Sequence, residues 1–431
     1  MLPFDVQQGA PLLLQGAERT TRADLRKRST ELESCLRQRG VTRLLVKSDQ
    51  PGRILSAIDA ATRMSADLFI AHTDLSSSVI DDIVREHQIG AVLEADGEQA
   101  TGIGPAPASS RICLMTSGTT GRPKVASYAQ EHFLARFAGQ PSLSALSHSR
   151  WLLTYQPTTF AGLQVLLTAV YAMATLVVPD ERTPLGFFDA AQRHRVTHIS
   201  GTPTFWRSLL MVMPPGSLPD VQQSTLGGEA IDQATLDRIR GAFPQARITH
   251  IYASTEAGVV FAVNDGRAGF PAAWLTEGVQ GSQLRIRDGL LEVRSPRRMT
   301  EYLGQSVGTP FVEDSWLRTA DRVAVEGDRV HFLGRLDSVI NVGGAKVDPF
   351  SVEAFLLGLE GVTEVRVVGV SNQLTGFVVA ADVVLASGVD PEAARQRILA
   401  ECYQKLPRTH VPRVLRIVDV IPVLGSGKKA V

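Results

Sequence analysis

The chain has 431 residues, of which 44% are hydrophobic and 20% charged, a balance typical of globular proteins that bury a sizeable core. Its 44 basic and 44 acidic side chains cancel, which argues against nucleic acid as a partner. The cysteines Cys35, Cys113 and Cys402 have neither a disulfide-framework spacing nor a zinc spacing, and no apolar run is long enough to span a membrane. We therefore expect a reduced, cytoplasmic protein of two or three domains.

Apolar, β-branched runs alternate with amphipathic segments from about Val41 onward. Residues 42–48 and 66–72 are predicted strands, and residues 53–64 between them a helix. Serines 76–78 offer N-caps for a second helix, whose apolar face leads into a strand that ends near residue 94. The alternation returns in residues 170–180, 190–201 and 238–254. This βαβ rhythm predicts mostly parallel sheets covered by helices.

A polar stretch rich in Gly and Pro, residues 262–281, interrupts the rhythm, and two strand-like runs follow at 291–296 and 323–335. The remainder is a smaller α+β unit, with strands at 364–371, 376–385 and 414–422 and a helix at 391–406. We expect an α/β large N-terminal domain, residues 1–334, and a small α+β C-terminal domain, residues 338–431, joined by residues 335–337.

The strand at 111–115 runs directly into TSGTTGRPK. Glycines let backbone N–H groups approach phosphate oxygens, hydroxyls add donors and the lysine adds charge. The Walker A spacing is absent, and a loop of this composition is by itself more often a surface turn. The candidate phosphate-binding residues are Thr116, Ser117, Gly118, Thr119, Thr120, Gly121 and Lys124.

As a whole string, TSGTTGRPK resembles the signature loop of the acyl-adenylate-forming superfamily. That superfamily comprises acyl- and aryl-CoA ligases, adenylation domains of nonribosomal peptide synthetases, and luciferases. Five further stretches are similar to superfamily motifs and occur in the same order: LGGEA (226–230), YASTE (252–256), WLRTAD (316–321), GRLDSVINVGGAKVDPFSVE (334–353) and IPVLGSGKKAV (421–431).

The resemblance implies a role for each motif. Gly228, Glu229 and Ala230 are expected to border the adenine and Tyr252 to lie against its face, and Ala253 and Ser254 are expected among the ATP-binding residues. Thr255 is expected at the α-phosphate and Glu256 on Mg²⁺, which prefers oxygen ligands. Asp321 and Arg335 are expected on the ribose. Lys428, six residues after Pro422, matches the catalytic lysine that bridges the acid and the α-phosphate, although a lysine near a chain end is usually a solvated charge.

The resemblance also implies a small domain that rotates about Asp337, and a thiol tunnel lined by Gly343, Gly344 and Lys346; an ordinary tight turn is the alternative for the two glycines. His250 either contacts adenine or caps a strand. Four positions depart from the pattern, namely Val125, Ala253, Ala320 and Asn341. Alanine replaces glycine harmlessly unless φ must be positive.

The acyl pocket is expected around Thr159, Phe160 and Ala161, with Gly227 and Gly258, although Thr159 and Phe160 equally suit core packing. No acidic residue stands in this stretch to pair with an α-ammonium group, and a buried unpaired ammonium is costly. The expected substrate is therefore an aliphatic or aryl carboxylic acid without an α-amino group.

Together these features predict an enzyme that uses ATP and Mg²⁺ to form an acyl-adenylate, then transfers the acyl group to CoA or to the phosphopantetheine of a carrier protein. The alternatives are a stand-alone amino-acid adenylation domain, an amide synthetase, and a non-catalytic member that binds nucleotide or acyl ligand. The sequence does not specify the acid or the oligomeric state.

Overall fold

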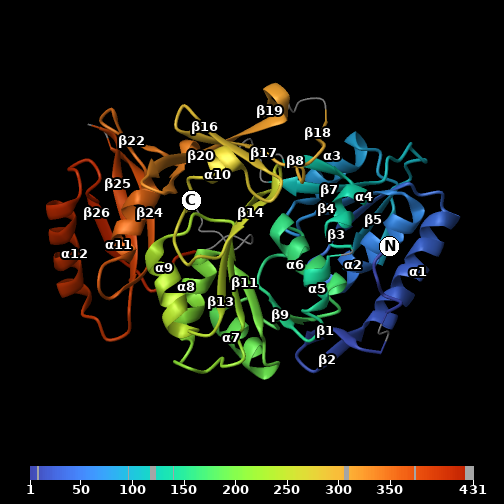
Figure 1. The fold of residues 1–431 in the computed structure, drawn as a ribbon. Coiled ribbons are helices and arrows are strands. Elements are labelled where there is room, and N and C mark those ends of the chain that lie inside the picture. Colours follow the sequence, from blue (N-terminus) through green and yellow to red (C-terminus); the bar gives the residue numbers. More distant parts are fainter. Residues whose placement is uncertain are drawn as a thin grey trace. The chain divides into compact units, whose positions relative to one another are not determined.

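The computed structural model describes residues 1–6, 9–95, 97–116, 123–138, 140–304, 310–372 and 375–422. The chain divides into two compact units, whose helices and strands are labelled in Figure 1. The first comprises Met1–Ser200, Ala253–Val259 and Ser295–Val312, and the second Gly201–Tyr252, Val260–Arg294 and Glu313–Val431. This grouping does not test the predicted hinge at residues 335–337, about which the small domain is expected to rotate. The hinge therefore stays a prediction. No helix within the described ranges has the length and apolarity that crossing a bilayer requires.

The first unit contains the sheet that leads into the phosphate loop. Its strand order is β18-β8-β7-β4-β3-β5-β6, and β3 pairs in parallel with β4 and β5, as β4 does with β7. Helices α2 (Pro51–Met64) and α3 (Ser77–Glu86) connect the parallel strands, and the Ser76 hydroxyl caps α3 as predicted. The strands are β3 (Arg43–Lys47), β4 (Asp67–Ala71), β5 (Ala91–Glu94), β6 (Gly97–Ala100), β7 (Arg111–Thr116), β8 (Lys124–Ala129) and β18 (Glu301–Leu303).

A second group of strands in this unit follows the order β11-β9-β10-β1-β2. Its bounds are β1 (Pro11–Gln15), β2 (Glu18–Thr21), β9 (Arg150–Leu153), β10 (Thr175–Val178) and β11 (His198–Gly201). The accompanying helices are α1 (Arg22–Gln38), α4 (Gln130–Ala135), α5 (Pro141–Ser144), α6 (Phe160–Tyr171) and α7 (Pro184–Arg193).

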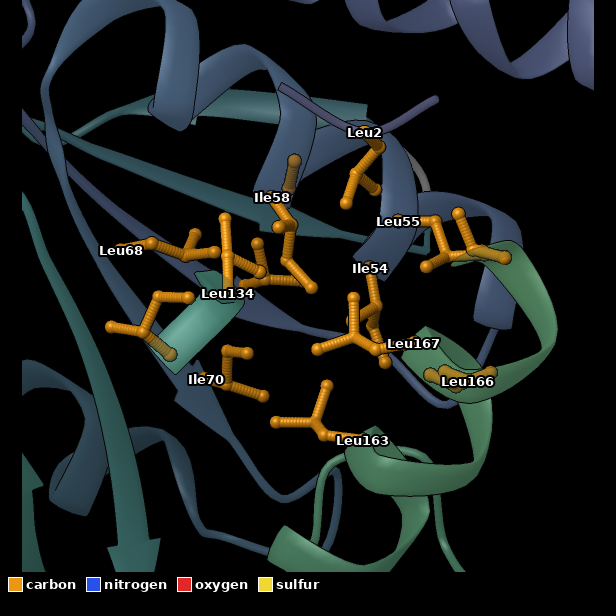
Figure 2. Close-up of a cluster of buried hydrophobic side chains, with 14 of the residues drawn as sticks. Leu2, Ile54, Leu55, Ile58, Leu68, Ile70, Leu134, Leu163, Leu166 and Leu167 are labelled. Carbon is orange, nitrogen blue, oxygen red and sulfur yellow. The ribbon is translucent and has the colours of Figure 1, made fainter. Parts of the chain in front are cut away.

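The core of the first unit forms where α2 and α6 direct their apolar faces toward β4 (Figure 2). Ile54 and Ile58 of α2, Leu163 of α6 and Leu68 of β4 are each fully buried. Full burial of one such side chain contributes roughly 1.5–3 kcal/mol, so this packing fixes β4 and, through it, β7.

The second unit has a parallel pair, β12 (Gln223–Gly227) with β13 (Arg247–Ser254), beside α8 (Pro203–Val212) and α9 (Gln233–Ala242). An antiparallel sheet of order β15-β21-β20-β17-β16 follows, where the sequence broke its rhythm. Its bounds are β15 (Phe270–Pro271), β16 (Gln283–Arg287), β17 (Leu290–Arg294), β20 (Trp316–Glu326) and β21 (Arg329–Arg335); β14 (Gly258–Val263) and α10 (Trp274–Glu277) precede it or lie between its strands.

The C-terminal part of the second unit has its own hydrophobic core, centred on buried residues such as Val365, Val383 and Ile398. Its strand order is β23-β22-β25-β24, with β26 parallel to β25. The bounds are β22 (Ile340–Val342), β23 (Ala345–Val347), α11 (Pro349–Leu357), β24 (Val362–Asn372), β25 (Gly376–Leu385), α12 (Pro391–Lys405) and β26 (Val414–Ile417). The predicted small α+β module is confirmed, and so is the α/β class of the larger part.

Candidate functional site

The phosphate loop connects the two strands of an antiparallel hairpin. Strand β7 ends at Thr116, β8 begins at Lys124, and these two residues are register partners in the ladder. Both ends of the loop are therefore held by backbone pairing at the carboxyl edge of β4 and β7, the edge where parallel sheets place their ligands. Ser117, Gly118, Thr119, Thr120 and Gly121 lie outside the described residues.

Tyr302 connects the loop to the predicted magnesium ligand. It lies on β18, which pairs with β8, and its hydroxyl donates a hydrogen bond to Glu256 Oε1 at 2.5 Å. Thr116 also hydrogen-bonds Tyr302, and the Lys124 ammonium lies 5.4 Å from the centre of its ring. Burial, with the nearby charge of Glu256, raises the pKa of Tyr302, so the phenol stays protonated and donates. Thr116, Lys124 and Glu256 are thus brought together by a tyrosine that sequence reasoning missed.

The segment around Glu256 is fixed by backbone contacts. The Thr255 carbonyl accepts a hydrogen bond from the Tyr128 hydroxyl, and the Glu256 carbonyl accepts one from Met299 N at 2.9 Å. Gly258 has a φ of +71°, and a Cβ there would lie 2.2 Å from the Arg297 carbonyl oxygen. This glycine, expected in the acyl pocket, is required by the close approach of two backbones.

Magnesium suits this arrangement. No group of three potential metal-ligating side chains occurs among the described residues. A single carboxylate such as Glu256 is nevertheless sufficient for Mg²⁺, which retains waters and takes its remaining ligands from substrate phosphates.

The predicted ribose and hinge residues lie together in the second unit. Tyr252 donates a hydrogen bond to Asp321 Oδ2 at 2.5 Å, and its ring packs against Phe261 and Phe332, with centroids 5.2 Å away in each case. Arg335 lies 3.5 Å from Asp321 and makes two hydrogen bonds to Asp337, at 3.0 and 2.8 Å. The hydrogen bond from Arg335 lowers the pKa of Asp337.

Glu229 belongs to a buried network in the same unit. It follows β12, which ends at Gly227, and its Oε2 accepts hydrogen bonds from Thr204 N at 3.1 Å and from the Thr204 hydroxyl at 2.8 Å. Arg207 donates to that hydroxyl at 3.2 Å and forms ion pairs with Asp232 at 3.2 Å and Glu364 at 2.8 Å. The predicted adenine-binding segment is therefore connected, through Arg207, to β24. Gly228 and Ala230 flank Glu229 in this loop.

The segment predicted to open the acyl pocket begins α6. The Thr159 hydroxyl is the N-cap of this helix, accepting from Gly162 N at 3.1 Å. Phe160 is 8% exposed and packs against Tyr128 and Phe133, and Ala161 is partly buried. The preceding Thr158 hydroxyl contacts His72 Nδ1 at 2.8 Å, and burial lowers the pKa of this histidine. His72 directly follows β4, and the end of a predicted strand was the signal that could have identified it.

The remaining predicted residues have plain structural surroundings. Gly343 and Gly344 form the turn between β22 and β23 with φ values of +59° and +90°, and Lys346 is exposed on β23. Ala253 and Ala320 lie in strands and have no positive φ, so these replacements of glycine are tolerated, as expected. His250 contacts the Arg267 carbonyl at 3.0 Å. Lys428 lies outside the described residues.

Residues 20–288 match the AMP-binding enzyme family, and residues 351–428 match the C-terminal domain of AMP-binding enzymes. A CoA ligase from Mycobacterium tuberculosis, specific by name for a 7a-methyl-1,5-dioxo-octahydroindenyl propanoyl group, is 28% identical over 347 residues, which cover 78% of this chain and 68% of that protein. A probable 2-succinylbenzoate–CoA ligase from the same species is 29% identical over 74% of this chain and 82% of its own.

Solved structures show the same fold. The anthranilate CoA ligase AuaEII in complex with anthranoyl-AMP superimposes with a TM-score of 0.81 at 19% identity, covering 98% of this chain and 93% of its own. The family match spans most of the chain in sequence order, from the first unit's sheets to the C-terminal module. The chain therefore belongs to the AMP-binding enzyme family.

Proposed function

We propose that this protein activates a carboxylic acid with ATP to form an acyl-adenylate and then transfers the acyl group to a thiol. The observation that carries the proposal is the cluster of Thr116, Lys124 and Glu256 around Tyr302, at the exit of a parallel sheet. A hydroxyl and a cation at the two ends of a Gly/Thr loop, with a carboxylate held beside them by Tyr302, suit a magnesium-bound polyphosphate.

In the first step, an oxygen of the acid attacks the α-phosphorus of ATP, the bond to the β-phosphate breaks and pyrophosphate leaves. The barrier is the repulsion between a carboxylate and a polyanion, so positive groups where charge develops accelerate the step. Lys124 and the loop hold the β- and γ-phosphates, Thr255 positions the α-phosphate, and Lys428 bridges it to the acid. Glu256 would hold Mg²⁺, whose charge would neutralise phosphate oxygens.

In the second unit, Asp321 and Arg335 bind the ribose, and the loop with Glu229 borders the adenine. Glu229 already accepts two hydrogen bonds from Thr204, so its carboxylate is held in one position before nucleotide arrives. Such preorganisation reduces the ordering that binding requires. The module from residue 338 onward then pivots at Asp337 for thiol transfer, with Gly343, Gly344 and Lys346 beside the incoming thiol.

The acid lacks an α-amino group, because the Thr158–Ala161 stretch contains no carboxylate for an ammonium to pair with. CoA is the favoured acceptor, since most of the relatives described are CoA ligases by name. A carrier protein is the second candidate. It is favoured by an isonitrile lipopeptide synthase from Streptomyces coeruleorubidus that is 28% identical over 73% of this chain, a match covering only 23% of that synthase. A cytoplasmic location accords with the three free cysteines.

The decisive experiment is acid-dependent ATP–pyrophosphate exchange over a panel of fatty, aryl and amino acids, followed by trials with CoA, a carrier protein and amines. We expect exchange with non-amino acids only. Folded protein that supports no exchange with any acid in the presence of Mg²⁺ would refute the proposal in favour of a non-catalytic member.

Lys428→Ala tests the role assigned to the lysine. We expect exchange to fall by about 10²–10³ or more, because one charge contact to the transition state is lost, while ATP binding measured by calorimetry persists. Lys405→Ala is the control, since this lysine pairs with Glu401 on the surface of α12. Unchanged exchange in Lys428→Ala would remove Lys428 from the site.

A further inference from the structure

Arg136 is a partly buried residue whose guanidinium group is surrounded by aromatic rings. It follows α4 directly, and its guanidinium carbon lies 4.3 Å from the ring centre of Phe133, 5.4 Å from Phe160, 5.6 Å from Phe137 and 5.9 Å from Tyr128. Its Nε donates to the Phe133 carbonyl at 3.0 Å. Both terminal nitrogens are buried, and neither has a hydrogen-bond partner among the residues that the structure describes.

This environment is unfavourable for a cation without an anion. Burial, with a smaller contribution from the nearby charge of Arg297, lowers the pKa of Arg136 to about 10. Among the residues that the structure describes, no carboxylate acts on its charge, and the aromatic rings with the Phe133 carbonyl compensate for the lost hydration. An unpaired buried charge is costly, and a guanidinium with two free N–H edges is shaped to receive a carboxylate through two parallel hydrogen bonds.

The cation lies next to the proposed site of adenylation. The Tyr128 ring that packs against Arg136 ends in the hydroxyl that binds the Thr255 carbonyl, one residue before Glu256. Phe160, another of the four rings around Arg136, begins the helix predicted to line the acyl pocket. All of these residues belong to the first unit. An acid whose reacting carboxylate lies beside Thr255 would therefore reach Arg136 with a body about as long as one tyrosine side chain.

We propose that Arg136 is a specificity-determining residue that binds a second carboxylate at the far end of the acid substrate. The preferred substrates are dicarboxylic acids with a flat or apolar body, which packs against Tyr128 and Phe160 while Arg136 neutralises the distal charge. This inference rests on the proposed adenylation, and it names the substrate class of the same site. Arg297 adds positive potential from the side of the Gly258 segment.

The test uses acids matched in body but differing in the second carboxylate: benzoate against isophthalate, and hexanoate against adipate. Pyrophosphate exchange is measured for the wild type, Arg136→Met and Arg136→Lys. We expect the wild type to prefer the diacid by on the order of 100-fold in kcat/KM, as for a desolvated charge pair. Arg136→Met should lose that preference and Arg136→Lys should retain part of it. Because Met suits an aromatic environment, Arg136→Met should fold and melt no lower than the wild type.

Arg22→Met is the matched control. Arg22 is fully buried in the same unit, donates one hydrogen bond to the Ala174 carbonyl at 3.0 Å and likewise has unpartnered nitrogens among the described residues. It is the first residue of α1, whereas the four rings around Arg136 come from β8, from α4 and the residue after Arg136, and from α6. Its substitution should leave the ratio of diacid to monoacid unchanged.

The inference would be overturned if the wild type preferred the monoacids, or if Arg136→Met had the same ratio of diacid to monoacid kcat/KM as the wild type. In either case the observed exchange would still support adenylation. If no acid supports exchange, the proposed function fails, and binding decides the inference separately. In that case, a rise in melting temperature with isophthalate or adipate that Arg136→Met abolishes supports the Arg136 site. Equal melting temperatures for the wild type with and without these diacids would overturn it.

Discussion

The ion pair between Arg207 and Glu364 predicts that Glu364→Gln destabilises the wild type but stabilises the Arg207→Met variant. The two side chains are 3% and 4% exposed, and Arg207 also holds Asp232 and the hydroxyls of Thr204 and Thr235. Arg207→Met leaves the carboxylates of Asp232 and Glu364 buried without their ion-pair partner, which should destabilise the contact between α8 and β24 by about 3–5 kcal/mol. Glu364→Gln alone leaves Arg207 paired with Asp232 and should cost only about 1–2 kcal/mol.

The informative comparison is the double variant. In the Arg207→Met background, Glu364→Gln removes an unpaired buried charge, so the same substitution should stabilise by about 1–2 kcal/mol instead of destabilising. Hydrogen exchange of the β24 amides reports the free energy of local opening, and each tenfold change in exchange corresponds to about 1.4 kcal/mol. The amide of Val365, which donates to Glu364 Oε1 at 3.1 Å, is the most direct probe.

Arg267 and Asp328 supply the control. They form a two-pronged pair at 2.8 and 2.9 Å in the same unit, but their side chains are 53% and 73% exposed. Arg267→Met should therefore leave β24 exchange unchanged. Additive effects of Arg207→Met and Glu364→Gln would show that the carboxylate is not held by Arg207 in solution, and the reasoning from burial would fail.

Two further predictions concern Asp348 and Gly258. Burial raises the pKa of Asp348, the N-cap of α11, to about 6, so the folded state binds its proton more tightly than the unfolded chain does. The stability that this proton contributes is full below about pH 4 and is lost as the pH rises through about 6. The difference in unfolding free energy between the wild type and Asp348→Asn, which keeps a capping oxygen, should fall by on the order of 2 kcal/mol across that window; a constant difference would contradict the raised pKa. Gly258→Ala should destabilise the first unit by at least about 2 kcal/mol, because the added methyl group meets the Arg297 carbonyl. The same substitution should reduce ATP–pyrophosphate exchange. Gly289 also has a positive φ, of +74°, but a Cβ added there would meet no atom within 4 Å. Gly289→Ala therefore isolates the conformational cost of alanine at a positive φ, about 1 kcal/mol. Equal melting temperatures for these two variants would show that the close approach has no energetic weight.

The sequence predicted what local patterns encode. Periodicity located β3, α2, β4 and α3, because each element carries its own apolar face. It did not predict that β7 and β8, the strands on either side of the phosphate loop, pair antiparallel. The pairing of a strand as short as β8 with β7 and β18 depends on the whole sheet and not on a local pattern. The C-terminal module was predictable for the same reason as the βαβ region, with compact strands and one long amphipathic helix.

The contacts that assemble the site were not predictable from local pattern. Tyr302 reaches Glu256 across 46 residues, Tyr128 reaches Thr255 across 127, and Arg207 reaches Glu364 across 157. One tyrosine or arginine in a chain has no periodic signature, and only the folded backbone selects its partner. Motif resemblance named Glu256 and Thr255, but it did not name the side chains that hold them.

Arg335 is shared between two carboxylates, and this sharing has a thermodynamic consequence. Its guanidinium lies 3.5 Å from Asp321, the proposed ribose ligand, and makes two hydrogen bonds to Asp337, the proposed pivot. A nucleotide that recruits Arg335 to its ribose competes with Asp337 for the same donors, so binding weakens the interaction that holds the pivot. Linkage is reciprocal, and rotation at Asp337 must then change nucleotide affinity by the same factor. In the proposed mechanism, one arginine would therefore link the occupancy of the ribose site and the angle of the pivot in a single equilibrium.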